Sequence, residues 1–174
     1  MNNTELEALR LAFEFHDGQK RKYTNEPYVV HCISVADIIK SVTDDIDIIC
    51  AAYLHDTLED TNIDPKIIEN IFGARCLNLV YQVTNVSRPE DGNRATRKQL
   101  DLEHLVKADK DGQTIKLADL IHNTQDVVKY DKDFAIYYLR EKEKLLKVLT
   151  KGNKELYKKA CNSVAQSKLE LLSS

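Results

Sequence analysis

The spacing of apolar residues predicts helices along the whole chain. Between residues 4 and 15, leucine, alanine and phenylalanine recur at intervals of three and four, which places them on one helix face. Similar spacing, bounded by proline, glycine and short polar segments, predicts further helices over residues 28–39, 66–72, 77–86, 94–108, 114–128, 132–149 and 154–172. No run alternates with the period of a strand over a useful length. We therefore expect an all-α fold, with one helical-bundle domain over residues 1–174.

The most apolar stretch, residues 46–54, predicts a buried helix that Asp44 or Asp45 caps. We expect this helix to continue to residue 60. One imidazole and three carboxylates would then lie three or four positions apart on one face. These side chains are His55, Asp56, Glu59 and Asp60.

A divalent cation is the most economical compensation for such a cluster, because crowded carboxylates repel one another and lose hydration. Imidazole and carboxylate together suit Mn, Fe or Zn. His31 and Asp119 occur in similar helical contexts, and Lys116 and Asn123 lie on the same helix face as Asp119. The alternatives are a helix end with solvated acids and a capping histidine, and a hydrogen-bonded core around Asp119.

The composition is that of an ordinary globular protein, with 43% hydrophobic and 30% charged residues among 174. The net charge of −3 argues against general binding of nucleic acid, which needs a basic surface. A small phosphorylated ligand needs only a local basic cluster. Two such clusters occur, each of which can also be a solvated surface: Lys20, Arg21 and Lys22, and Arg94, Arg97 and Lys98.

The apolar runs and the cysteine spacing predict the cellular compartment and the redox state of the cysteines. No apolar run is long enough to span a bilayer, and the first residues lack a signal-peptide core, so we expect a cytoplasmic protein without membrane contacts. The four cysteines are scattered in apolar contexts without metal-site spacing. We expect reduced core residues, and the sequence is compatible with a homo-oligomer.

The order of these residues resembles the metal-ligand pattern of the HD-domain phosphohydrolases. Four short segments resemble the hydrolase domain of the RelA/SpoT-type alarmone enzymes. They are Gln-Lys-Arg-Lys, Glu-Pro-Tyr-Val-Val-His, Leu-His-Asp-Thr-Leu-Glu-Asp-Thr and Ile-Lys-Leu-Ala-Asp-Leu-Ile-His-Asn. The resemblance covers roughly residues 5–150. It implies an HD-type bundle that hydrolyses the 3′-pyrophosphate of guanosine tetra- or pentaphosphate, usually with Mn²⁺ although another divalent cation can serve.

The resemblance also implies the roles of individual residues. The metal ligands would be His31, His55, Asp56 and Asp119. Glu59 and Asp60 would activate the attacking water. The nucleotide contacts would be Arg21, Lys22 and Asn123, and by their charge Lys20, Arg97 and Lys98 are further candidates for binding phosphate.

The chain departs from the family in three respects. The synthetase half of the long enzymes is absent, which predicts a stand-alone small hydrolase. Cys32 follows His31 where many relatives have proline, and residues 88–113 match only loosely. Two alternatives stay open: a phosphohydrolase acting on a nucleoside monophosphate or on the 2′-phosphate of NADPH, and a nucleotide-binding module without turnover. The intact Glu59–Asp60 pair argues against the second, because a pure binder needs no general base.

Overall fold

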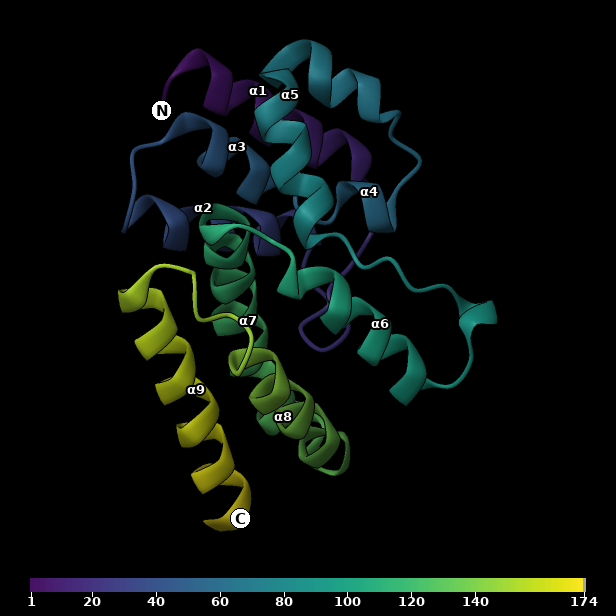
Figure 1. Cartoon of the computed structure of the whole chain (residues 1–174), viewed down its shortest axis with the longest axis vertical. Helices are drawn as coiled ribbons and strands as arrows, with labels where there is room; N and C mark the ends of the chain where they lie inside the picture. Colours follow the sequence, from purple (N-terminus) through teal and green to yellow (C-terminus); the bar gives the residue numbers. More distant parts are fainter. Residues whose placement is uncertain (174) are drawn as a thin grey trace. The chain divides into compact units, whose positions relative to one another are not determined.

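A computed structural model describes residues 1–173, without the side chains of Gln125 and Asp126 (Figure 1). Its regular elements in this range are helices, with one isolated antiparallel bridge between Lys20 and Pro27. The all-α prediction is therefore confirmed. The chain divides into two compact units, with the boundary between Thr84 and Asn85. Each unit is described by itself, and a single domain over residues 1–174 stays a prediction.

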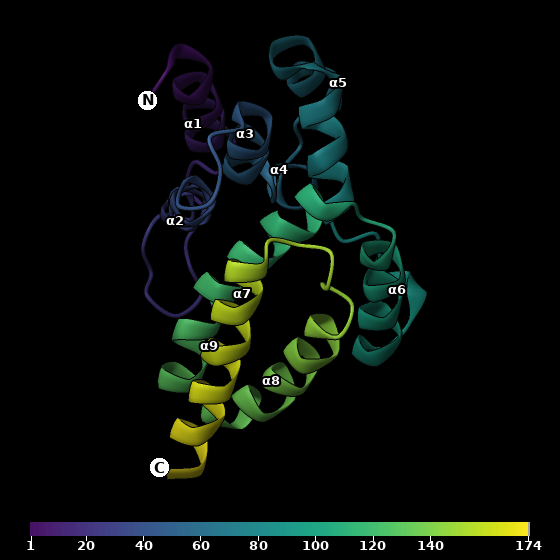
Figure 2. The ribbon, with the colours of Figure 1, turned by 60° about the vertical axis from the view of Figure 1, so that its left-hand side comes forward.

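The first unit is built around its most apolar helix. Helix α3 packs against α1, α2 and α5, and residues 48–54 are all buried (Figure 2). The apolar run that predicted a buried helix therefore forms the centre of this unit. The helices are α1 (Asn3–Phe15), α2 (Val29–Lys40), α3 (Ile46–Leu54), α4 (Thr57–Asp60) and α5 (Pro65–Val83).

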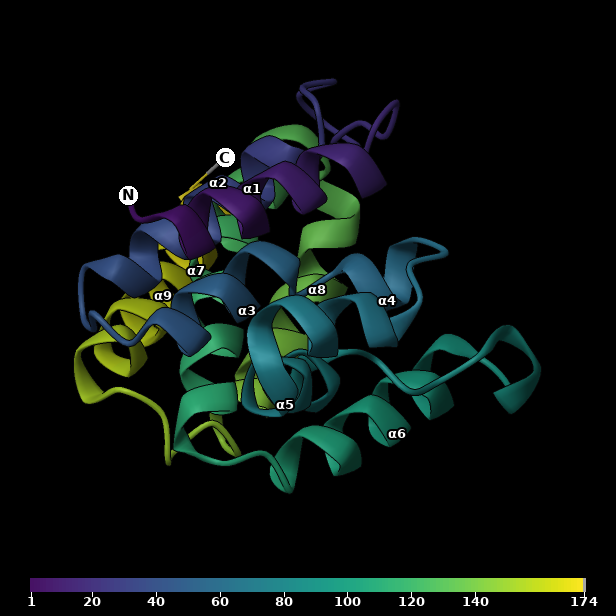
Figure 3. The same cartoon turned by 90° about the horizontal axis from the view of Figure 1, so that it is seen from above.

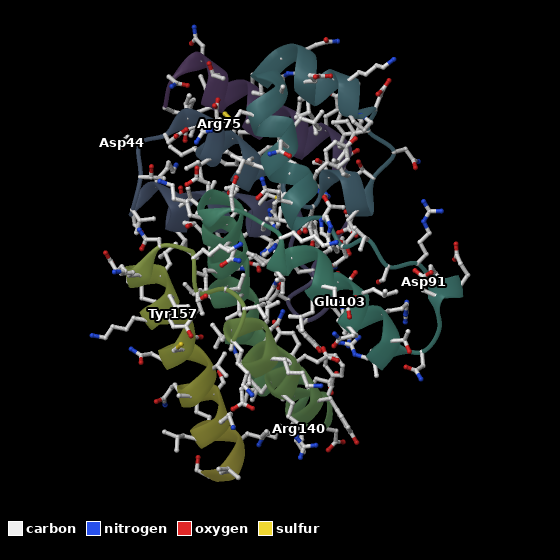
Figure 4. All side chains as sticks on the ribbon, in the orientation of Figure 1. Asp44, Arg75, Asp91, Glu103, Arg140 and Tyr157 are labelled. Atoms are coloured by element: carbon white, nitrogen blue, oxygen red, sulfur yellow. The ribbon has the colours of Figure 1, made fainter. Side chains whose placement is uncertain are left out.

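Several predicted helix boundaries of the first unit are confirmed. The Asp45 side chain accepts a hydrogen bond from the N–H of Asp47 and so caps α3. Helix α5 begins at Pro65, and Gly73 interrupts it with a φ of 86°. This positive φ favours glycine, because other residues meet steric strain there. Arg75 of α5, which is labelled in Figure 4, forms ion pairs with Asp45 and Asp47 at the start of α3.

One prediction about these helices is wrong. The helix from residue 46 does not continue to residue 60, because α3 ends at Leu54 and α4 is a separate turn. The first helix begins close to its predicted start and is capped by Asn2, whose Oδ1 accepts from the N–H of Glu5 at 2.8 Å.

The second unit is a group of longer helices in which α7 packs against α8 and α9, and α8 packs against α9 (Figure 2). Its core includes Leu117, Leu120, Leu149 and Leu156, which are all fully buried. The elements are the short 3₁₀ helix η1 (Pro89–Asp91), α6 (Arg94–Val106), α7 (Lys110–Tyr130), α8 (Lys132–Leu146) and α9 (Lys154–Ser173).

Helix α7 begins four residues before its predicted start. The Asp109 side chain accepts from the N–H groups of Asp111 and Gly112, so the segment expected to break a helix starts one instead. The predicted loop before α6 is present and runs alongside that helix (Figure 3). Buried Asp101 of α6 accepts hydrogen bonds from the N–H groups of Val86 and Ser87 and holds the loop there.

Two further features of the described residues are the state of the cysteines and the apolarity of the helices. All four cysteines are free; Cys32, Cys50 and Cys76 are buried in the first unit, and Cys161 of α9 is half-buried. Burial raises the pKa of the three buried thiols. Among the described residues, none of the helices has the length and apolarity that crossing a membrane requires.

Candidate metal centre

Three predicted metal ligands of the first unit converge on one point. His31 lies on α2, and His55 and Asp56 form the junction between α3 and α4. The Nε2 atoms of the two histidines are 3.2 Å apart. The Oδ2 atom of Asp56 lies 2.9 Å from Nε2 of His55 and 3.4 Å from Nε2 of His31. Both imidazoles are buried, and the carboxylate is 14% exposed.

The break in the helix aims His55 at this point. The Nδ1 atom of His55 lies 2.8 Å from the carbonyl oxygen of Ala52, and the Thr57 hydroxyl donates to the carbonyl of Leu54 at 2.6 Å. In a continuous helix, backbone N–H groups four positions later would bind these carbonyls. Side chains bind them instead, which explains why the predicted single helix is interrupted.

The hydrogen bond to Ala52 also sets the tautomer of His55. A carbonyl oxygen only accepts, so Nδ1 must carry the proton, and in the neutral imidazole Nε2 then presents its lone pair. This lone pair faces Oδ2 of Asp56. Burial would raise the pKa of Asp56, but the charges and hydrogen bonds of His55 and His31 in their protonated forms lower it well below its usual range. The ionised carboxylate is therefore stabilised by positive charge on this side, and a cation that takes the place of the imidazole protons would supply that charge.

The donor geometry fits a divalent cation. Bonds of about 2.1 Å separate neighbouring ligand atoms by about 3.0 Å at right angles and about 3.4 Å at tetrahedral angles. The three observed separations run from 2.9 to 3.4 Å. Among the described residues, these three are the group of histidines and acids close enough to share one ion. Two imidazoles and a carboxylate are suitable ligands for a transition metal.

Tyr28 is a functional candidate that our sequence analysis did not identify. Its hydroxyl donates to Oδ2 of Asp56 at 2.7 Å, and its ring meets the His31 ring edge-on at 5.6 Å between centroids. It also lies against the ring of buried His16, at 4.9 Å between centroids. The available signal was its position three residues before His31, which is one helical turn.

Glu59 and Asp60 lie on α4 and are exposed. They do not share one continuous helix face with His55, contrary to our expectation. Nevertheless, partial burial of its carboxyl, together with the charges of Asp56 and Glu59, raises the pKa of Asp60 to about 6. The acids of α4 are therefore electrostatically linked to the ligand cluster. Their roles in activating water stay predictions.

The basic loop folds back toward Tyr28. The N–H of Arg21 donates to the carbonyl of Glu26, and the N–H of Tyr28 donates to the carbonyl of Gln19. The Arg21 guanidinium lies 5.9 Å from the centroid of the Tyr28 ring, whereas Lys20 and Lys22 are exposed. Arg21 thus lies against Tyr28, which itself donates a hydrogen bond to Asp56 of the cluster.

The second unit holds the remaining predicted ligand within a separate network. Lys116 forms an ion pair with Asp119 at 2.8 Å, and Asn123 donates to the other carboxylate oxygen. The polar stripe on α7 is therefore a hydrogen-bonded network, as one of our alternatives proposed. A role of Asp119 as a fourth ligand stays a prediction.

The cations of α6 differ from each other. The Lys98 ammonium lies 3.3 Å from Oδ2 of Asp101 and so helps to hold the loop before the helix. Arg97 has a buried Nε that meets no hydrogen-bond acceptor in the described part of the chain. Contacts of Arg97, Lys98 and Asn123 with a nucleotide stay predictions.

Comparisons with known proteins identify the family of this chain. The family described as HD domain matches residues 8–145. The guanosine-3′,5′-bis(diphosphate) 3′-pyrophosphohydrolase MESH1 of Xenopus tropicalis is 36% identical over 126 residues, which cover 70% of this chain and 68% of that protein. MESH1 of Drosophila melanogaster is 35% identical with the same coverage.

Solved structures confirm the HD-type fold. A structure described as a metazoan orthologue of SpoT that hydrolyses ppGpp matches with a TM-score of 0.86 and 28% identity, over 97% of this chain and 98% of that chain. A Listeria monocytogenes protein with 21% identity matches with a TM-score of 0.65 over 83% of this chain and shares the fold.

Proposed function

The chain belongs to the HD-domain family, and from this premise we propose that it hydrolyses the 3′-pyrophosphate of guanosine tetra- and pentaphosphate. The products are GDP or GTP and pyrophosphate. The observation that carries the proposal is the convergence of His31, His55 and Asp56, in a chain 36% identical to a MESH1 pyrophosphohydrolase. A nucleotide substrate of this kind is consistent with a cytoplasmic enzyme.

The proposed cofactor is Mn²⁺, held by His31, His55 and Asp56 with Asp119 as a fourth ligand. A mixed set of imidazole and carboxylate donors supports a transition metal over Mg²⁺, which prefers oxygen ligands and water. A bound divalent cation supplies Lewis acidity, which makes a water molecule nucleophilic near neutral pH and offsets the charge of phosphate oxygens.

The chain's own residues perform the remaining tasks. Glu59 lies next to the cluster in sequence but outside the ligand group, and it accepts the proton of the attacking water. Asp60 orients that water, and Tyr28 fixes the Asp56 carboxylate through its hydrogen bond. The guanidinium of Arg21 offers paired donors to diphosphate oxygens. Lys20, Lys22 and Asn123 add further contacts to the nucleotide.

Incubation with guanosine tetraphosphate and Mn²⁺, followed by chromatography of the products, tests this function. We expect GDP and pyrophosphate in equal amounts, none after removal of the metal with a chelator, and recovery when Mn²⁺ is restored. Parallel reactions contain a nucleoside monophosphate and NADPH. Orthophosphate released from one of these, with the tetraphosphate left intact, would replace the alarmone by another substrate. Nucleotide binding without any turnover would identify a regulatory module.

A further inference from the structure

We propose that His16 and Gln19 are positioning residues, which fix the short helix α4 and its acids Glu59 and Asp60 relative to the metal cluster. The task of these two acids at the attacking water rests on the proposed function. The hydrogen-bonded link from His16 through Gln19 to Asp60 rests on contacts within the first unit. Neither His16 nor Gln19 was among our candidate site residues.

The side-chain amide of Gln19 joins the end of α4 to His16. Its Nε2 donates to the carbonyl oxygen of Asp60 at 2.9 Å, and its Oε1 lies 2.8 Å from Nδ1 of His16. The carbonyl of Asp60 belongs to the last residue of α4, where backbone carbonyls have no partner within the helix. Because an amide oxygen only accepts, Nδ1 of His16 must carry the proton. The direction of the Gln19 amide is therefore set at both ends.

The same two residues also hold Tyr28, which binds the residue before α4. The carbonyl oxygen of Gln19 accepts from the N–H of Tyr28 at 2.9 Å, and the rings of His16 and Tyr28 are 4.9 Å apart between centroids. The Tyr28 hydroxyl in turn donates to Oδ2 of Asp56 at 2.7 Å, and Asp56 immediately precedes α4. His16 and Gln19 thus reach both ends of α4, one end through Tyr28 and the other directly.

Helix α4 needs support of this kind because of its length. It has four residues, and a helix this short makes too few hydrogen bonds to be stable alone. The N–H groups of Glu59 and Asp60 both donate to the carbonyl of Asp56, at 3.2 and 2.9 Å. The position of the two acids relative to the metal ligands therefore depends on what holds the backbone of this turn.

Packing alone does not account for a histidine at position 16. The imidazole is buried, and its Nε2 meets no hydrogen-bond partner in the described part of the chain. A buried polar atom without a partner costs free energy, which an apolar ring of similar shape would avoid. The imidazole offers what an apolar ring lacks, namely the Nδ1–H that directs the Gln19 amide.

The test combines amide hydrogen exchange in α4 with metal content and steady-state kinetics. Gln19→Met keeps the length of the side chain and removes both hydrogen bonds of the amide. We expect exchange at the N–H groups of residues 59–61 to become faster by about threefold or more. Metal content should stay the same, kcat should fall about 10-fold, and KM should change by less than about twofold. Gln166→Met, at an exposed glutamine of α9, is the control and should change none of these.

Two variants of His16 separate the hydrogen bond from the packing. His16→Phe keeps a ring against Tyr28 and removes Nδ1–H. It should reproduce the faster exchange and the lower kcat of Gln19→Met without lowering Tm, because the unpartnered Nε2 is removed as well. His16→Asn supplies an amide N–H near the position of Nδ1 and should restore most of the lost kcat. The double variant of His16→Phe and Gln19→Met should be no slower than Gln19→Met, since both act through one link.

Two results would overturn the proposal. One is unchanged hydrogen exchange in α4 of Gln19→Met. The other is a loss of kcat in His16→Phe that accompanies a lower Tm and adds in full to the loss in Gln19→Met, since this would make His16 a packing residue. The exchange measurement does not depend on turnover, so the link can stand if guanosine tetraphosphate is not hydrolysed.

Discussion

The two units treat their buried charges in opposite ways. In the first unit, His31, His55 and Asp56 bring three potential metal-binding atoms within 3.4 Å of one another. In the second, Asp119 already has a cation in Lys116. The first arrangement favours a positive ligand, whereas in the second the opposite charges of the two side chains neutralise each other. This contrast can be tested in each unit.

The largest effect is expected from Asp56→Ala. This change removes the carboxylate that both histidines face, so the first unit should lose its metal and the protein its activity. The metal content of the dialysed variant and its turnover of guanosine tetraphosphate measure this. Asp44→Ala, at an exposed acid before α3, is the control and should keep both. A fully loaded Asp56→Ala would contradict the proposed site.

The Asp119→Ala variant tests whether the second unit supplies a ligand to the same metal. If Asp119 is the fourth ligand, this variant also loses metal and activity. It should lose stability as well, because half-buried Lys116 is left without its carboxylate, a cost of about 3 kcal/mol. Reduced stability with full metal occupancy would assign Asp119 to the network of its own unit alone.

Glu59→Ala should affect turnover without affecting the metal. Loss of a general base slows a reaction by about 10² to 10⁴, while the ligand cluster stays intact. The same protein sample is assayed for both metal content and kcat. Loss of metal in this variant would make Glu59 a ligand and not a base.

Tyr28→Phe should weaken metal binding by about 10- to 100-fold, because hydrogen bonds to ligating groups hold them in position. Tyr53→Phe is the matched control. Tyr53 belongs to the same unit, where it is buried while Tyr28 is half-buried, and its hydroxyl donates to Glu5 instead. The control should lose about 1 kcal/mol of stability and keep its metal affinity. Equal metal affinities in the two variants would reduce Tyr28 to a packing role.

The smallest expected effect is a pH-dependent change in the Tm of the metal-free protein. The pKa of Asp60 is about 6 in the folded state and about 3.9 in an unfolded chain, so the folded state binds the proton more tightly. The resulting stabilisation is complete below about pH 4 and is lost as the pH rises through 6. Asp60→Asn should therefore gain Tm relative to the native protein between pH 4 and 7. A constant difference in Tm would show that Asp60 is not perturbed.

The helices and the ligand types could be predicted because they depend on local patterns. The apolar residues of α3 must be buried in any arrangement of the helices, so their burial could be predicted. Asp45, Pro65 and Gly73 set helix starts and a helix break through local backbone effects. Metal chemistry at His55 and Asp56 could also be predicted, since imidazole and carboxylate in helical contexts already indicate it. Local spacing was enough for these predictions, whereas the assignment of His31 to the same metal came from the resemblance to the HD-domain phosphohydrolases.

The rest depends on contacts between distant segments or on competition for the same backbone groups. The end of α3 follows from side chains that bind the carbonyls of Ala52 and Leu54, which periodicity does not reveal. Tyr28 became visible only when α2 placed it against Asp56.

The reactivity of the cysteines can report local opening of the first unit, because their burial differs. Cys32, Cys50 and Cys76 are buried in that unit, and Cys32 follows His31 in the sequence, whereas Cys161 of α9 is half-buried. The raised pKa values suppress the thiolate form that reacts with alkylating agents. The rate at which an alkylating agent labels Cys32 therefore measures how often the first unit opens locally. A bound cation should lower this rate, because it stabilises the closed state.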